Sequence, residues 1–375
     1  PHPCGDWVIA MVPYGVLIAL LFTAAGLAPG PPFAQAQDHR SLDLTIRNYG
    51  LSFGNAPRIN GLRFNYRDRG LERVNGLNLT LWRPYDTEVY DPTGVVSGLA
   101  VGLPLTGAGS INGLGVGLFG VEADASLRGL AVGGLGTGAG ENLSGLAIGG
   151  LGAGVGEHFT GIGVGGLGIG SGGDLRGVAA GGLGVGAGED IHGIMAGGLG
   201  VGAGETLTGL AVGGLGVGAG ESLRGIFAGG LGIGAGADLA GLSAALVGIG
   251  AGEEITGLAV SGVGIGAGNR LRGVFVAGVG AAAPSIVGLT VGTAIGSEHY
   301  TGVGLAPAYF RITDGGQLRG VSVSAFNQLK GTQQGLTIGL FNYARALNGV
   351  QLGVLNYAGN NPRWLRLLPG LNVNL

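Results

Sequence analysis

Few residues in this 375-residue chain have side chains that could do chemistry, and they are widely spaced. Two pairs of adjacent carboxylates, Glu189-Asp190 and Glu253-Glu254, have the composition of a general acid and base, but that chemistry also needs a cleft that shifts a pKa. Histidines could ligate zinc, yet none lies in an HExxH or HxH pattern. The histidines beyond the first residues are His39, His158, His192 and His299.

Two glycine motifs have the form of a dinucleotide-phosphate loop. The pattern GxGxxG occurs at 161–166 and 168–173, but neither copy stands between a strand and a helix, and such matches arise by chance in a chain this rich in glycine. The single cysteine, Cys4, precedes the expected mature chain, which excludes thiolate chemistry. We therefore expect no catalytic residue, no metal site and no cofactor, and a protein that is not an enzyme.

The composition excludes several classes of protein. Glycine accounts for 89 of 375 residues, 46% of residues are hydrophobic and only 11% are charged, with a mean hydropathy of +0.46. Disordered chains have the opposite balance. The net charge of −3 excludes a basic nucleic-acid binder, so we expect no nucleic-acid partner.

Short repeats must position these residues. A glycine preceded by an apolar–polar pair recurs every 16 residues from Gly113 to Gly273, which is typical of a repeat architecture. In the unit 207–222, LTGLAVGGLGVGAGES, Leu207 is numbered position 1, and large apolar residues fall at positions 1, 4, 6, 9 and 11. Their alternation predicts two short strands, at about positions 3–8 and 9–14, and a polar turn from position 15 to position 2.

The large apolar residues move from one face of the strand to the other between positions 6 and 9, and again between positions 1 and 4. A change of face needs a corner or a bulge, which glycine supplies. We expect Gly213 or Gly214 to have a positive φ or a close backbone contact, and Gly209 to lie beside the second change. The glycines predicted to be structural residues are Gly129, Gly145, Gly177, Gly209, Gly213, Gly214 and Gly225.

Four segments are expected along the chain. Residues 1–36 comprise an upstream extension and a signal peptide, with an apolar run at 15–25 and a small-x-small cleavage site ending at Ala36; the alternative is an N-terminal membrane anchor. A lead segment follows at 37–58. A single repeat domain covers 59–358, with a regular 16-residue core at about 111–270, and a closing strand covers 359–375.

The end units carry a further pattern, in NGLRFNY (60–66), NGLNLTLW (75–82), GLFNYA (339–344) and GVLNYA (353–358). These stretches resemble the tandem G-[LVI]-x-[LVI]-G-[LVI]-x-N units of bacterial surface-repeat proteins, including those of spirochaetes. They are also similar to the pattern of the β-flower fold, a shallow closed ring of β-hairpin petals. The resemblance implies an exported, membrane-associated protein without catalysis, and it supplies no catalytic residues.

Three all-β architectures fit the repeat. The preferred one closes tandem β-hairpins into a shallow ring or barrel, which removes exposed sheet edges. A β-solenoid with one unit per coil would stack the position-15 glutamates about 4.8 Å apart, where they would repel one another. A transmembrane β-barrel needs strands of about 9–11 residues with aromatic girdles, and the predicted strands are shorter. The hairpin ring is therefore the expected fold, with the solenoid and the barrel as alternatives.

The expected function is that of an exported cell-envelope or surface repeat protein with a structural or interaction role. A surface that is apolar on both faces of a strand needs lipid or a partner, so membrane lipid or an envelope component is the expected partner, at the outer membrane or cell surface of a bacterium. The alternative is a small pore or a lipid-binding ring in the outer membrane.

Deletion of one period tests the repeat. Removing residues 206–221 should leave a folded all-β protein, because repeat units interact mainly with their neighbours. Removing only eight residues should unfold the array, since it destroys the pairing of the strands. Circular dichroism of the two deletions distinguishes these results, and equal strand content in both would show that 16 residues is not the structural unit.

Overall fold

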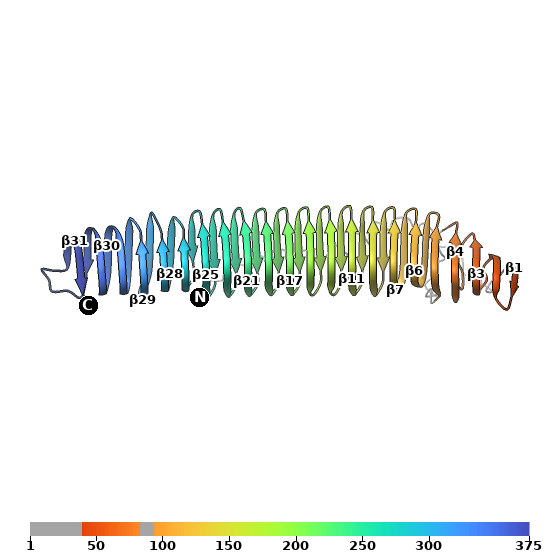
Figure 1. Ribbon diagram of the computed structural model, residues 1–375, viewed down its shortest axis with the longest axis horizontal. Helices are drawn as coiled ribbons and strands as arrows, with labels where there is room; N and C mark the ends of the chain where they lie inside the picture. Colours follow the sequence, from red (N-terminus) through yellow and green to blue (C-terminus); the bar gives the residue numbers. More distant parts are fainter. Residues whose placement is uncertain (1–39, 83–93, 375) are drawn as a thin grey trace, which may run out of the picture. The chain divides into compact units, whose positions relative to one another are not determined.

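The computed structural model describes residues 40–82 and 94–374, and the regular structure of these residues is all-β. The expected signal peptide and its cleavage site at Ala36 lie outside the described residues. The chain forms two units, Pro1–Glu189 and Asp190–Leu375. Within each unit the strands lie side by side in a row (Figure 1).

The strands of the first unit are β1 (Ser41–Ile46), β2 (Tyr49–Gly54), β3 (Arg58–Asn65), β4 (Arg73–Thr80), β5 (Val95–Gly102), β6 (Leu105–Gly117), β7 (Gly120–Gly133), β8 (Gly136–Ala139), β9 (Asn142–Gly149), β10 (Gly152–Val155), β11 (His158–Gly165), β12 (Gly168–Ser171), β13 (Leu175–Gly181) and β14 (Gly184–Ala187).

The strands of the second unit are β15 (Ile191–Gly197), β16 (Gly200–Ala203), β17 (Thr206–Gly213), β18 (Gly216–Ala219), β19 (Ser222–Gly229), β20 (Gly232–Ala235), β21 (Asp238–Ala245), β22 (Gly248–Ala251), β23 (Glu254–Ser261), β24 (Gly264–Ala267), β25 (Arg270–Ala277), β26 (Gly280–Ala282), β27 (Ser285–Val291), β28 (Ala294–Leu305), β29 (Tyr309–Val323), β30 (Phe326–Ala358) and β31 (Leu367–Asn374).

Each regular repeat forms one coil of a β-solenoid. A coil contains one long strand and one short strand, such as β17 and β18, and each pairs in parallel with the equivalent strand of the next coil. Thr206 lies beside Ser222 in the long-strand sheet, and Gly216 lies beside Gly232 in the short-strand sheet. The first unit has the same 16-residue register, with Gly145 beside Gly161.

The all-β tandem repeat is confirmed, and the solenoid alternative is the arrangement that the structure has. The preferred hairpin ring is wrong, because neighbouring repeats pair in parallel. Glu205 and Glu221 do occupy successive coils, and the amide of Glu221 donates to the carbonyl of Glu205 at 2.9 Å. Both side chains are exposed, and two charges about 5 Å apart in water repel by only about 1 kcal/mol. Several backbone hydrogen bonds per coil, each contributing about 1 kcal/mol, outweigh that repulsion.

Large apolar side chains lie on both faces of the long strands. In β17, Leu207 and Ala211 are buried, whereas Leu210 and Val212 are exposed. Positions 1, 5 and 7 are buried and positions 4 and 6 are exposed, so the expected change of face between positions 1 and 4 is wrong. The corner between the two strands does lie at Gly214, between β17 and β18. In the short strand, Val217 at position 11 is buried.

Glycine at position 3 allows successive coils to approach closely. Gly209 has a φ of +130°, and a Cβ added there would overlap the carbonyl oxygen of Gly193 in the preceding coil. Gly214, at the corner, does not have a positive φ, but an added Cβ would overlap the carbonyl oxygen of Gly198. Gly213 likewise lies against the carbonyl oxygen of Gly216. The other predicted structural glycines at position 3 have the same positive φ and the same carbonyl contact; these are Gly129, Gly145, Gly177 and Gly225.

Antiparallel strands flank the parallel coils. In the lead segment, β1 pairs antiparallel with β2, and Leu44 lies beside Leu51. Near the other terminus, β31 pairs antiparallel with the last part of β30, and Leu352 lies beside Leu371. The chain therefore reverses direction beside the first and the last parallel pairs that the structure describes.

Two glycine-to-alanine substitutions test the coil-to-coil contact. We expect Gly209→Ala to lower the free energy of unfolding by at least about 2 kcal/mol, because alanine at a positive φ is strained and its Cβ meets a backbone oxygen. The matched control is Gly234→Ala, since Gly234 is a strand glycine with open space around the added Cβ. We expect the control to change stability by less than about 1 kcal/mol. Equal losses in denaturant unfolding would contradict the proposed role of position 3.

Candidate functional site

Charge is confined to one edge of the regular coils. Between residues 125 and 284, every Asp, Glu and Arg occupies position 15, 16 or 2 of its repeat. Glu221 at position 15 and Arg224 at position 2 are exposed examples. We call this line of turns and strand beginnings the charged edge.

The outward side of the long-strand sheet is aliphatic beyond the charged edge. Positions 4 and 6 of the long strands point away from the core, and we call these two rows the apolar face. Leu210 is 37% exposed and Val212 is 46% exposed, whereas Leu207 on the inward side is 0% exposed. In the second unit, the position-4 row consists of Ile194, Leu210, Ile226, Leu242, Leu258 and Val274. Each coil therefore displays aliphatic side chains to the outside as well as burying others.

A second apolar row runs along position 9, on the edge of the coil that lies opposite the charged edge. Position 9 forms the corner between the long and the short strand, and Leu215 there is 50% exposed. We call this row the leucine edge. In the second unit it consists of Leu199, Leu215, Leu231, Val247, Val263 and Val279, and in the first unit of Leu135, Leu151, Leu167 and Leu183. The coil is consequently amphipathic in cross-section, with an apolar edge and a charged edge.

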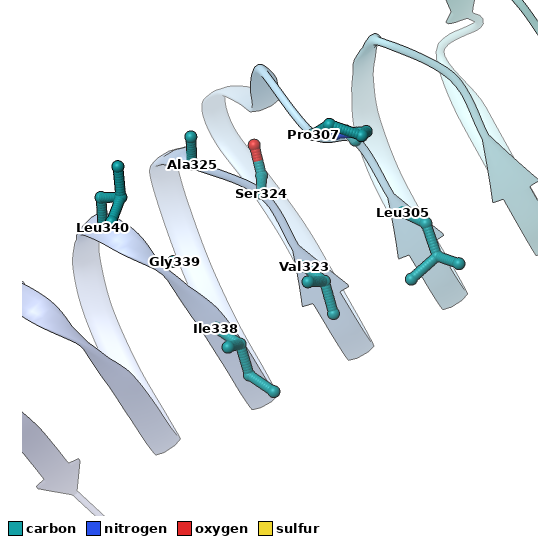
Figure 2. A pocket seen from close by; sticks show the side chains of 9 residues that line it. Leu305, Pro307, Val323, Ser324, Ala325, Ile338, Gly339 and Leu340 are labelled. Carbon is teal, nitrogen blue, oxygen red and sulfur yellow. The ribbon is translucent and has the colours of Figure 1, made fainter.

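An apolar groove lies at the leucine edge of the later coils. It has a volume of about 380 Å³ and lies between Leu305, Val323 and Ile338 of position 6 and the corner residues Ala325 and Leu340. Figure 2 shows the three position-6 side chains on successive strands and the two corner residues above them. Because alanine replaces a larger aliphatic residue at this corner, the row dips there and exposes the side of the strands.

The sequence contained a signal for the apolar face. Arg224, Ile226 and Ala228 occupy positions 2, 4 and 6, and in an unbroken strand these share one side. A charged residue at position 2 therefore places positions 4 and 6 outside. The prediction went wrong because it placed a change of face between positions 1 and 4, whereas positions 2, 4 and 6 lie on one side of a single strand.

Two of the side chains that could do chemistry, His158 and Glu254, lie on the charged edge. His158 lies 3.8 Å from Asp174, and Glu254 lies 3.8 Å from Arg270, all on the charged edge. The motif at 161–166 runs along β11 into a corner and not into a helix. Within the described ranges, no three His, Cys, Asp or Glu residues gather as a metal site would require, and no helix is long and apolar enough to cross a membrane.

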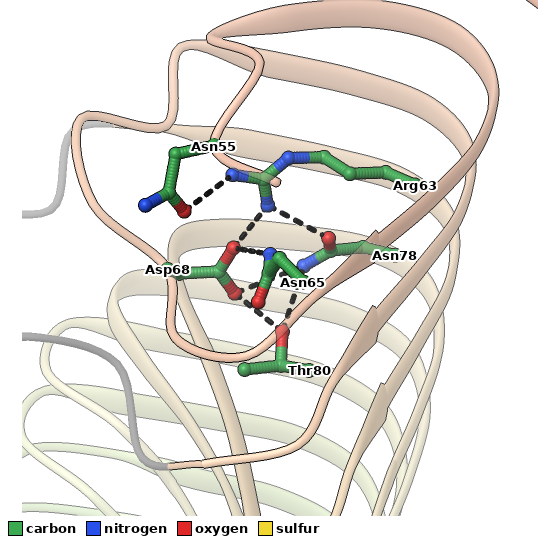
Figure 3. Close-up of polar contacts among 6 residues, drawn as sticks. All are labelled: Asn55, Arg63, Asn65, Asp68, Asn78 and Thr80. Carbon is green, nitrogen blue, oxygen red and sulfur yellow. Dashed lines mark hydrogen bonds and ion pairs between the residues drawn. The ribbon is translucent and has the colours of Figure 1, made fainter. Parts of the chain in front are cut away.

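A buried polar cluster fills the interior beside β3 and β4 (Figure 3). The guanidinium of Arg63 pairs with Asp68, and both side chains are at least 95% buried. Asp68 comes from the segment between the two strands and also accepts from Asn65, from Asn78 at 3.1 Å and from Thr80 at 2.6 Å. Every acceptor oxygen of the carboxylate is thus used, so the cluster is a structural ion pair inside the coils.

The chain matches no protein-family model, no curated protein and no solved structure. The resemblance of the end units to surface-repeat proteins thus stays an expectation from the sequence.

Two carboxylates in the first coils form ion pairs that differ in burial. We expect Asp68→Asn to destabilise the coils around β3 and β4 by about 3–5 kcal/mol, because it leaves the buried charge of Arg63 without a counter-ion. The control is Glu72→Gln, which removes the exposed partner of Arg58 and should cost less than about 1 kcal/mol. Hydrogen exchange of the amides in β3 and β4 measures both effects. Similar protection in the two variants would show that the cluster does not hold these coils together.

Proposed function

We propose that this chain is an exported cell-envelope repeat protein with a structural or interaction role and no catalytic activity, and that its partner is membrane lipid. The observation that carries the proposal is the separation of the apolar face and the leucine edge from the charged edge. A surface of this kind resembles that of an interfacial amphipathic helix, which buries its apolar side among acyl chains and keeps its charges in water. Export rests on the N-terminal sequence and on the resemblance of the end units.

The chemistry of the apolar surface favours lipid over a second copy of the chain. Its rows consist of exposed aliphatic side chains such as Leu210, Val212 and Leu215. A protein–protein interface needs a complementary shape and direct hydrogen bonds. A fluid bilayer needs neither, because acyl chains adapt to the aliphatic side chains that they cover.

The other candidate function, a pore or a lipid-binding ring, has no comparable observation in its favour. The side chains that point into the regular coils, such as Leu207, Leu223 and Leu239, are buried, and the interior is filled rather than open.

A site-specific fluorescent probe tests the lipid contact. Cys4 is the only cysteine, so a Cys4→Ser chain accepts a single new thiol. We expect an environment-sensitive dye at Leu215→Cys to shift to the blue when phosphatidylcholine vesicles are added, because position 9 enters the acyl region. The same dye at Glu221→Cys, on the charged edge of the same coil, should not shift.

The comparison of the two dyes does not depend on the N-terminal segment, which is identical in both chains. Equal responses at the two positions, or a response at Glu221→Cys alone, would contradict the proposed orientation. Circular dichroism of both labelled chains confirms that the coils remain folded, since both substituted positions are exposed in the structure.

A further inference from the structure

The outer surface of the short-strand sheet changes its chemistry in the last coils of the second unit. In the regular coils, positions 10 and 12 are glycines, such as Gly264 and Gly266. The parallel register continues these two columns through β26 and β28 to Tyr309 and Arg311 in β29. Side chains with rings and positive charges therefore stand where the regular coils expose bare backbone.

Stacked aromatic rings cover this surface from β29 onward. Tyr309 and Phe326 have ring centroids 6.0 Å apart, and Phe326 and Phe341 have centroids 4.9 Å apart. Tyr343 and Tyr357 form a separate, nearly parallel stack at 5.1 Å. The rings point outward, because the alternate residues along the same strands are buried. Each ring remains partly exposed to solvent.

Basic side chains lie on the same outward side. Arg311 is two residues after Tyr309. Lys330 is four residues after Phe326, and Arg345 is four residues after Phe341. An even spacing along a strand places each cation on the same side as the ring before it. Lys330 lies 3.8 Å from Asp314. Among the residues that the structure describes, no acidic group is within ion-pair distance of Arg311 or Arg345. We call the five rings and these three cations the aromatic–basic face.

The balance of charge in this segment is opposite to that of the preceding coils. From residue 300 onward the sequence contains Arg311, Arg319, Lys330, Arg345, Arg363 and Arg366, and Asp314 is the single acid. From residue 190 to residue 299, acids outnumber arginines. The net charge of −3 for the whole chain thus conceals a locally positive end of the second unit.

The loop before β31 extends the aromatic–basic face. Trp364 is 78% exposed and stands in the sequence between Arg363 and Arg366. Leu367, also exposed, lies beside Tyr357 in the antiparallel pair of β30 and β31. An exposed tryptophan flanked by arginines is typical of segments that sit at the membrane–water interface.

The aromatic–basic face is continuous with the leucine edge. Position 9 of these coils is Leu340 and then Val354, which are 62% and 63% exposed, and position 10 follows each of them in the chain. The apolar groove shown in Figure 2 lies at this same edge. A bilayer in contact with the leucine edge would therefore meet the rings and cations at the depth of its headgroups.

We propose that the aromatic–basic face binds the headgroups of an anionic lipid bilayer and makes the last coils the preferred point of attachment. The inference rests on the proposed lipid function and adds the class of lipid. Tyr and Trp favour the headgroup region, and Lys and Arg beside an anionic surface strengthen attachment. Charge complementarity thus selects anionic over neutral lipid, while the apolar rows supply contact that both kinds of lipid share.

The test uses the full chain with two sets of vesicles, phosphatidylcholine alone and phosphatidylcholine mixed with phosphatidylglycerol. The double variant Arg311→Gln, Arg345→Gln should bind the anionic vesicles about 30-fold more weakly than the unchanged chain and the neutral vesicles equally well. The matched control is Arg58→Gln, Arg73→Gln, which removes two exposed arginines from the first unit. The control should retain the preference for anionic vesicles.

The possible results separate the two proposals. If every chain binds both kinds of vesicle equally, the inference about anionic lipid fails while the lipid function stands. If the dye at Leu215→Cys also fails to respond to either vesicle, the lipid function itself fails. If a soluble acidic polysaccharide binds the unchanged chain and not the double variant, while vesicles do not distinguish them, the face recognises a polymer and the lipid inference is wrong.

Discussion

Direct contact between the backbones of successive coils is the constraint on which the rest of this structure depends. At Gly209 and at Gly214 there is no room for a Cβ, because the carbonyl oxygen of the preceding coil occupies its place. Sheet hydrogen bonding holds neighbouring strands about 4.8 Å apart, and a corner of two residues can keep that spacing only where side chains are absent. The glycine content is thus a consequence of coils that turn sharply and stack in register.

The alternation of side chains along the long strand points aliphatic residues outward. Position 1 and position 11 supply large buried side chains, as Leu207 and Val217 do, while Ala211 and Gly213 occupy the rest of the inward side. Leucine and valine at positions 4, 6 and 9 have no interior to enter. Their exposure is costly in water, which is why a surface of this kind implies a partner. The proposed lipid contact and the proposed headgroup selectivity both derive from this arrangement.

The interior is polar in the first coils of the first unit and in the last coils of the second unit. Arg63 and Asp68 fill it beside β3 and β4, and a ladder of asparagines fills it in the last coils, with Asn327 donating to Asn342 and Asn342 to Asn356, each at 2.7 Å. Buried amides that bond to one another in successive coils fix the register, because a shift by one residue would leave each amide unpaired. The polar interiors therefore stabilise the coils that have fewest neighbours.

The sequence alone determined the 16-residue period, the all-β character, the glycine-containing corner within each repeat and the restriction of charge to one part of the repeat, because each of these follows from the local alternation and spacing of residue types. It did not determine whether neighbouring repeats pair in parallel, because the preference for a hairpin ring rested on the removal of sheet edges and on a repulsion between glutamates such as Glu205 and Glu221, which water largely screens. It also did not determine which apolar rows face outward. Leu207 and Leu210 are chemically identical, and only the strand that continues from position 1 to position 7 and points them to opposite sides decides that one belongs to the core and the other to the surface.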